Sequence, residues 1–430
     1  MAYDVIIDRD VTDGPQHLVA VDDIFFSVTD AKGIMTDVNE VFMHYAQYPW
    51  EEMIGKPHNL IRQVEMPGGV FKAMWDWIEA GKPFVGYVRN LAKSGSAYDV
   101  LATVTPLSDG HYLSVRTRPM TDYFQVAAEV YQEANIVEHQ AKRDGVGRRR
   151  RAQLGWARIC ELVPDYDAFM SEVLPAEVAA REEAGFVLPE GEGEVYEATA
   201  ALYKELEIFM GIQTSIKQSA EELLVACETL MQENSVTNQV KGEMEKVVAE
   251  GASRTLLLAP LQVWATMRGI IDENAQSLAE VAEELQGRAA KARTAIALAR
   301  LQAAQTATFS AEEDRIESMR MLYEAMEFAL RDMDNAVFLH SSLANRVELK
   351  VNSISELTKM PLEMIRRWSQ STAKQPFGEN IDPLVTQVEH AIQAADASIE
   401  QLQLSSRDLD EDPSVEGVHE ALERLRKAVF

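Results

Sequence analysis

Three long stretches in the second half of the chain repeat apolar residues in alternating steps of three and four. They cover residues 202–230, 267–285 and 316–354. Such a 3.5-residue repeat is typical of helices that pack nearly parallel to one another. The third stretch lasts more than five heptads, and a single helix cannot bury so long a stripe alone. We therefore expect a long helical bundle or coiled coil. Its partner helices belong to this chain or to a second copy, and we favour a homodimer.

Residues 20–120 differ from this helical half, because they are richer in glycine, proline and short β-type runs. Two strands with a hairpin pattern come first, several short helical pieces follow, and three strands close the region. The expected strands and the main helix lie at residues 24–30, 34–38, 85–90, 98–105, 111–117 and 70–80. The sequence therefore predicts an α+β unit in front of an all-α half.

Glycine and proline positions divide the rest of the chain. Gly145 and Gly147 interrupt a helical pattern, and the basic run Arg148–Arg151 follows them in a chain that is otherwise acidic. The predicted parts are an N-terminal segment (1–19), an α+β domain (20–120), connecting helices with the basic run (121–187), a linker (188–194), a long helical bundle (195–373) and C-terminal helices (374–430). The basic run is open to several interpretations: a solvated helix end, a site for an acidic partner, or a contact with the chain's own acidic helices.

The charge balance excludes some classes of partner. Among 430 residues there are 41 basic and 69 acidic ones, a net charge of −28. Phosphate backbones and anionic lipids repel such a chain, so we expect no nucleic-acid binding. No apolar run approaches the ~20 residues of a spanning helix, so we expect no membrane insertion. The two cysteines, Cys160 and Cys227, are too few for a disulfide framework or a cysteine-based zinc site. With no signal-peptide pattern or spanning segment, we expect a cytoplasmic protein.

Signatures of catalysis are missing from the sequence. It contains no phosphate-binding glycine loop, no nucleophile elbow and no Cys-x-x-Cys motif, and its eight histidines do not have metal-ligand spacing. We therefore predict that the protein is not an enzyme and holds no metal.

One motif series is more specific than the pattern of strands and helices. Residues 55–62 read Gly-Lys-Pro-His-Asn-Leu-Ile-Arg, and the pairs Met66-Pro67, Met74-Trp75 and Thr105-Pro106 follow. This series is similar to the FAD-binding PAS domain of bacterial aerotaxis receptors, over about residues 20–120. The resemblance implies a five-stranded antiparallel sheet with short helices that holds FAD and senses its redox state. Where the family has His-Pro-Asp, this chain has Gln63-Val64-Glu65.

The resemblance, read together with side-chain chemistry, selects the candidate cofactor-binding residues: His58, Asn59, Arg62, Glu65, Trp75, Phe84 and Asn90. The planar guanidinium of Arg62 can hold a pyrophosphate or a carboxylate. Trp75 offers a stacking face to an aromatic ring, and the two asparagines can hydrogen-bond ring carbonyls and N–H groups.

The same side chains also have purely structural interpretations. Trp75 shares one helix face with Phe71 and Ile78 and would then belong to the core. Arg62 would pair with Glu65, and His58 would make a local hydrogen bond instead of ligating a haem iron.

Two hypotheses for the whole chain follow. The first is a cytoplasmic sensor in signal transduction, in which a PAS domain binds FAD and reports redox or energy state, as in aerotaxis. Its helices would contact chemotaxis or other signalling proteins. The alternative is a structural or scaffolding protein with a ligand-free PAS domain and a self-assembling bundle. The alanine-rich stretch 295–304 distantly resembles the kinase-contacting tip of chemotaxis receptors, and close-packed core is the other interpretation of it.

Overall fold

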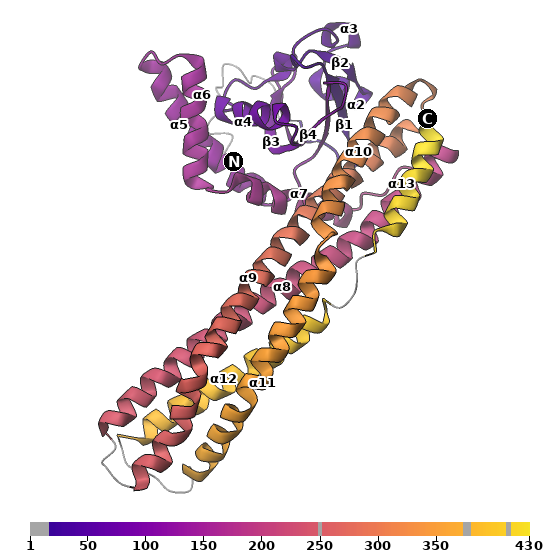
Figure 1. The fold of residues 1–430 in the computed structure, drawn as a ribbon. Coiled ribbons are helices and arrows are strands. Elements are labelled where there is room, and N and C mark those ends of the chain that lie inside the picture. Colours follow the sequence, from indigo (N-terminus) through magenta and orange to yellow (C-terminus); the bar gives the residue numbers. More distant parts are fainter. Residues whose placement is uncertain (1–16, 248–251, 373–379, 410–413) are drawn as a thin grey trace. The chain divides into compact units, whose positions relative to one another are not determined.

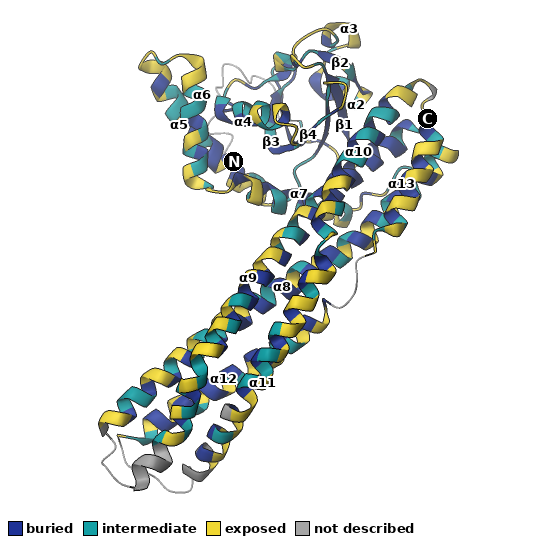
Figure 2. Cartoon of the chain, viewed as in Figure 1, coloured by how far each residue is buried: buried dark blue, intermediate teal, exposed yellow. Residues whose placement is uncertain are grey.

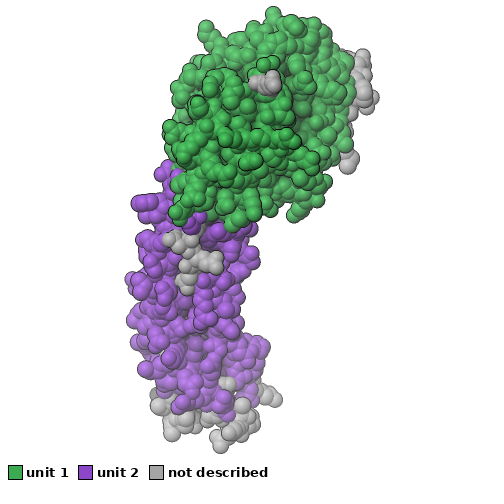
Figure 3. Space-filling view, turned by 90° about the vertical axis from the view of Figure 1, so that its right-hand side faces the viewer, with its two compact units in different colours: residues 1–210, 293–333, 415–430 green, residues 211–292, 334–414 purple. Residues whose placement is uncertain are grey.

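A computed structural model describes residues 17–247, 252–372, 380–409 and 414–430. Residues 1–16 of the predicted N-terminal segment lie outside the described residues. The chain divides into two compact units (Figure 3). Unit 1 comprises residues 1–210, 293–333 and 415–430, and unit 2 comprises residues 211–292 and 334–414.

Unit 1 contains a five-stranded antiparallel sheet in the order β2-β1-β5-β4-β3 (Figure 1). The strands are β1 (Phe25–Thr29), β2 (Met35–Val38), β3 (Phe84–Leu91), β4 (Ala97–Pro106) and β5 (Tyr112–Thr117). Gly33 has a φ of +74° in the turn between β1 and β2, a conformation that glycine adopts at low cost. The predicted succession of two strands, short helices and three strands along the chain is confirmed, as is the α+β class of this region.

Short helices cover the inner face of the sheet: α2 (Glu40–Ala46), α3 (Trp50–Met53), the 3₁₀ helix η1 (His58–Ile61) and α4 (Gly68–Glu79). Asn39 caps α2, since its Oδ1 accepts hydrogen bonds from the backbone N–H groups of Phe26 and Phe42. A buried aromatic group fills one end of this layer, with the rings of Phe25 and Tyr98 stacked at 5.7 Å.

The outer face of the same sheet is buried by helices of unit 1. Phe26 packs edge-on against Phe309 of α9 (Ala252–Phe309) with ring centroids 5.1 Å apart. The Tyr87 hydroxyl donates to Glu177 of α7 (Tyr166–Glu183). Because both faces are covered, all five residues of β1 are buried (Figure 2). Burial in β1 therefore does not alternate along the strand as it does in a half-exposed sheet.

Two further helices, α5 (Tyr123–Arg143) and α6 (Arg148–Leu162), form a hairpin in unit 1, and α6 packs against α4. The predicted break between them is confirmed: the turn contains Gly145, with φ at +76°. Unit 1 also holds η2 (Glu313–Arg315), α10 (Ile316–Val337) and α13 (Glu416–Val429). Residues 295–304 are buried on every side of α9, so the alanine-rich stretch is packed core.

Unit 2 has its own hydrophobic core. In the part of unit 2 that the structure describes, this core is built by α8 (Glu194–Val247), α9, α11 (His340–Thr372) and α12 (Asp382–Arg407). Each helix contributes to it: Leu223, Leu278 and Leu402 are fully buried, and Val351 is 3% exposed. The predicted long helical region is confirmed. Because these helices bury one another within one chain, the apolar stripes do not by themselves require a second copy. None of the described helices is long and apolar enough to span a membrane.

The stripe over residues 316–354 was expected to be one helix, and that expectation is wrong. α10 ends at Val337 and α11 begins at His340, with Phe338 and Leu339 in a turn. Met333, His340 and Val347 are nevertheless all buried. The seven-residue spacing of buried positions passes through the turn unchanged, so the periodicity of the sequence does not reveal the break.

Candidate functional site

A cavity of about 1240 Å³ opens between the inner face of the sheet, α4 and the α5–α6 hairpin. Small-molecule pockets usually measure about 300–1,000 Å³, so this one exceeds the common range. Side chains of β1, β3, β4 and β5 line its floor, η1 and α4 line its walls, and α5 and α6 line its mouth. All of these elements belong to unit 1.

Arg116 on β5 lies on the floor beneath a small polar network. Its Nη2 donates to Ser27 Oγ at 2.9 Å and lies 2.7 Å from His58 Nε2. Its guanidinium also stacks over the ring of Phe42, 4.9 Å from the centroid. Burial lowers the pKa of Arg116 to about 10, so the side chain stays charged at neutral pH. Loss of solvent and the Arg116 charge hold the pKa of His58 well below its usual 6.5. The neutral imidazole therefore accepts this hydrogen bond.

Two buried donors on the cavity floor have no protein partner. Arg116 Nη1 and Asn90 Nδ2 make no hydrogen bond, although the residues are only 5% and 3% exposed. Both residues line the cavity. A buried polar group without a partner costs about 1–3 kcal/mol. The floor is therefore suited to a ligand that carries hydrogen-bond acceptors.

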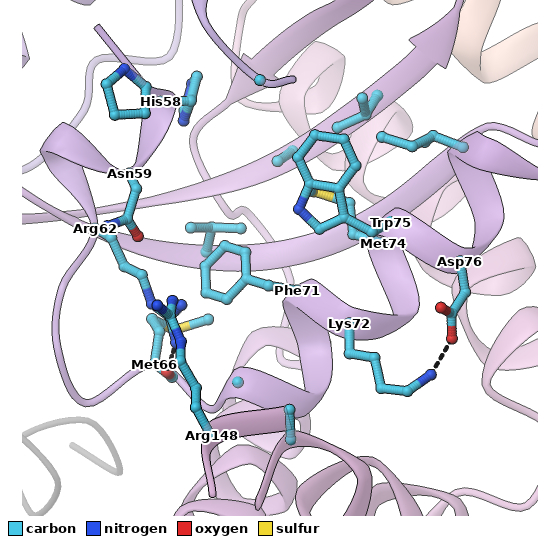
Figure 4. Close-up of a pocket in the computed structure, with 18 of the residues that line it drawn as sticks. His58, Asn59, Arg62, Met66, Phe71, Lys72, Met74, Trp75, Asp76 and Arg148 are labelled. Carbon is cyan, nitrogen blue, oxygen red and sulfur yellow. Dashed lines mark hydrogen bonds and ion pairs between the residues drawn. The ribbon is translucent and has the colours of Figure 1, made fainter. Parts of the chain in front are cut away.

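Arg62 lies where η1 ends, on the wall of the cavity (Figure 4). Its Nη2 donates to the carbonyl oxygen of Met66 at 2.8 Å, and its guanidinium lies 4.2 Å from the ring centroid of Phe71. The interpretation of Arg62 as the partner of Glu65 is therefore wrong. Burial, and then the nearby charge of Arg148, lower the pKa of Arg62.

Aromatic side chains of α4 continue the wall beside Arg62. Trp75 is half-buried and lines the cavity together with Phe71. The Trp75 ring meets Tyr112 edge-on at 5.8 Å, and a Cβ on Gly33 would lie 3.1 Å from it. These contacts hold the ring at the cavity wall, where it offers an aromatic surface to a ligand.

The structure brings five of the seven candidate residues to this cavity: His58, Asn59, Arg62, Trp75 and Asn90. Glu65 instead accepts a hydrogen bond from Asn135 at 3.0 Å and pairs with His139 at 3.2 Å. Phe84 is fully buried beside the rings of Trp77 and Tyr166. These two residues support the walls from outside the cavity.

The mouth contains charged residues that the sequence did not assign to this site. Glu138 of α5 and Arg148, Arg149 and Arg151 of α6 line it. The carboxylate of Glu138 accepts hydrogen bonds from the N–H groups of Gly68 and Gly69, at the start of α4. Burial raises the pKa of Glu138. Four successive arginines in the first turns of a helix are unfavourable next to the positive end of the helix dipole. This unfavourable placement was the signal in the sequence that could have indicated a functional role for the basic run.

No group of three or more potential metal ligands occurs among the residues that the structure describes.

Comparison with known proteins agrees with this geometry. Residues 35–116 match the sequence family described as PAS fold, so most of the floor and the α4 wall of the cavity belong to a PAS domain, whereas α5 and α6 follow the matched segment. The chain is 32% identical over 121 residues to the aerotaxis receptor of Escherichia coli (strain K12), over 27% of this chain and 24% of the receptor. The domain is therefore a PAS domain of the aerotaxis-receptor type. The chain matches about a quarter of that receptor's length.

Several solved structures resemble the same region. A sensory box histidine kinase/response regulator domain from Geobacter sulfurreducens is 18% identical, over 27% of this chain and 90% of that one, with a TM-score of 0.20. The LOV domain of the blue-light photoreceptor Aureochrome1 is 17% identical, over 28% and 93%, with a TM-score of 0.23. The Rhodobacter sphaeroides LOV protein is 14% identical, over 38% and 97%, with a TM-score of 0.22.

Proposed function

We propose that this chain is a non-catalytic PAS sensor that binds FAD in the cavity and reports redox or energy state through its helices. The observation that carries the proposal is the pair of unpartnered buried donors, Asn90 Nδ2 and Arg116 Nη1, on the floor of a large cavity. The similarity to an aerotaxis receptor supports the choice of ligand and a role in energy taxis.

The residues present fit a flavin. Asn90 and Arg116 would donate to carbonyl or nitrogen acceptors of the ring system, and Trp75 and Phe71 would contact its faces. Arg62 would hold a phosphate oxygen through its planar guanidinium. When bound, a flavin supplies a reversible change of redox state. A ligand that becomes more negative on reduction would bind more tightly beside the charged Arg116.

Arg116 is also well placed to pass on such a change. It lies one residue before the end of β5, and the chain then leads to α5. At this exit Met120 and Thr121 donate backbone hydrogen bonds to Glu177 of α7. We propose that the ligand state shifts the population between two packings of these helices. The output would be a contact with another signalling protein or with a second copy of this chain.

Titration with FAD tests the proposal. Arg62→Ala should weaken FAD binding about 10- to 100-fold, because a charge-assisted hydrogen bond contributes about 1.5–3 kcal/mol. Lys82→Ala, on an exposed turn outside the cavity, is the control and should bind like wild type. Unchanged FAD affinity in Arg62→Ala would contradict the assigned role of Arg62. A wild-type protein that binds no flavin would favour the ligand-free scaffold.

A further inference from the structure

The basic run of α6 lies at the mouth of the PAS cavity, although it follows the matched PAS segment by more than 30 residues. Arg148, Arg149 and Arg151 line this mouth, and Arg150 instead donates to Gln153 at 3.1 Å. Among the residues that the structure describes, none forms an ion pair with the three lining arginines. Three cations therefore surround one opening in a chain whose net charge is −28.

The positive charge at the mouth is concentrated further by Arg62. Figure 4 shows Arg148 extending toward Arg62, and its charge is one cause of the lowered pKa of Arg62. Two neighbouring guanidinium groups repel each other unless an anion lies near both. Glu138 is close enough to influence Arg62 and Arg151, but its two oxygens already accept hydrogen bonds from Gly68 and Gly69.

Backbone packing holds the hairpin against the PAS domain. Gly69 of α4 and Gly155 of α6 meet so closely that a Cβ on Gly69 would clash with the backbone of Trp156. A Cβ on Gly155 would overlap the carboxylate of Glu138. Contacts of this kind leave little room for sliding. The backbone of α6, which carries the arginines, is therefore held against the PAS domain at the cavity mouth.

The two ends of the cavity differ in chemistry. Asn90 and Arg116 lie on the floor, both more than nine-tenths buried, and each has a side-chain donor without a hydrogen-bond partner. The mouth presents Arg148, Arg149 and Arg151. An elongated ligand with an acceptor-bearing ring at one end and phosphate groups at the other would match both.

We propose that Arg148, Arg149 and Arg151 of α6, together with Arg62, bind the phosphate groups of the ligand, so that the PAS domain and the α5–α6 hairpin form one composite site. The identity of the ring rests on the function proposed above. The composite site selects a flavin dinucleotide over riboflavin, by residues outside the matched PAS segment. Guanidinium groups suit this role because they bind phosphate oxygens in pairs.

The test compares FAD, riboflavin and inorganic pyrophosphate as ligands of the full chain. The variants are the triple substitution Arg148→Gln, Arg149→Gln, Arg151→Gln and the control Arg150→Gln, which changes the same basic run outside the cavity. The triple variant should bind FAD about 100-fold or more weakly, if two charge-assisted contacts each contribute about tenfold. Its affinity for riboflavin should equal that of wild type, and Arg150→Gln should bind all three ligands normally.

The possible outcomes separate this inference from the proposed function. If wild type prefers FAD to riboflavin and the triple variant loses that preference, the composite site is supported. If both proteins bind FAD equally, the arginine site is refuted and flavin binding stands. If wild type binds no flavin, the proposed function is wrong. In that case, pyrophosphate binding by wild type that is lost in the triple variant would still support an anion site at the arginines. A wild-type protein that does not bind pyrophosphate would refute the anion site.

Discussion

Glu177 of α7 is a buried acceptor at the point where the chain leaves the PAS domain. It is 2% exposed. Its Oε1 accepts from the hydroxyls of Tyr87 at 2.5 Å and Thr121 at 2.6 Å and from the Thr121 N–H at 3.1 Å, and its Oε2 accepts from the Met120 N–H. These four bonds tie α7 to β3 and to the segment that connects β5 with α5.

We expect Glu177→Ala to lower the free energy of unfolding of unit 1 by about 3–5 kcal/mol. Each hydrogen bond to a charged acceptor contributes about 1.5–3 kcal/mol. Removal of the carboxylate also removes its desolvation cost, so the four contributions do not add in full. Glu177→Gln keeps one acceptor oxygen and should therefore lose less stability, about 1–3 kcal/mol. A loss remains because the amide nitrogen of glutamine cannot accept from the other donors.

Hydrogen exchange measured by mass spectrometry reads the effect locally. Glu177→Ala should accelerate exchange at residues 84–91 and 118–123, and chemical denaturation should give the loss in stability. Glu183→Ala, an exposed position on the same helix, is the control and should change neither. Wild-type exchange and stability in Glu177→Ala would refute the view that this carboxylate joins the PAS domain to α7.

Two further predictions concern the core and the pH dependence. Leu330→Asp places a carboxylate at a position that is 1% exposed and should destabilise unit 1 by about 3 kcal/mol or more. Leu404→Asp, at a position that is 48% exposed, should be nearly neutral. Equal melting temperatures for the two variants would refute the buried stripe. The pKa of His58 is well below 6.5 in the folded chain. As the pH drops below about 6.5, the His58 imidazole is therefore protonated in the unfolded chain before it is protonated in the folded one. The free energy of unfolding then falls by up to about 1.4 kcal/mol per pH unit. His58→Gln should flatten the wild-type stability curve between about pH 6.5 and 5, and identical curves would show that His58 does not titrate differently on folding.

Much of the fold could be predicted because its signals are local. The turn before β2 needs a glycine with positive φ, and Gly33 supplies it. The helical stripes follow from a 3.5-residue repeat, which the buried positions of α8 and α9 confirm. The turn at Phe338 could not be predicted, because buried positions on both sides keep the same spacing. Phe338 itself is 83% exposed.

The candidate site was predictable where the motif series extends, and the predicted residues that line the cavity are His58, Asn59, Arg62, Trp75 and Asn90. His58, Asn59 and Arg62 are close in sequence and line one wall. Phe84 is on the same strand as Asn90, but it lies beyond the cavity, where Trp77 and Tyr166 cover it. The α6 arginines reach the mouth through the turn at Gly145 and the contact between Gly69 and Gly155. Contacts between elements so far apart in sequence leave no local pattern.

The central claim is that the PAS cavity holds a flavin whose redox state the protein reports. Visible absorbance of the purified chain tests it most directly. The protein is supplemented with FAD and freed of unbound ligand, and its spectrum is then recorded on reduction and on re-oxidation under controlled oxygen. We predict blue and near-ultraviolet flavin bands that remain with the protein, disappear on reduction and return with oxygen. A protein that retains no flavin absorbance after supplementation, or one whose bound flavin cannot be reduced and re-oxidised, would contradict the account.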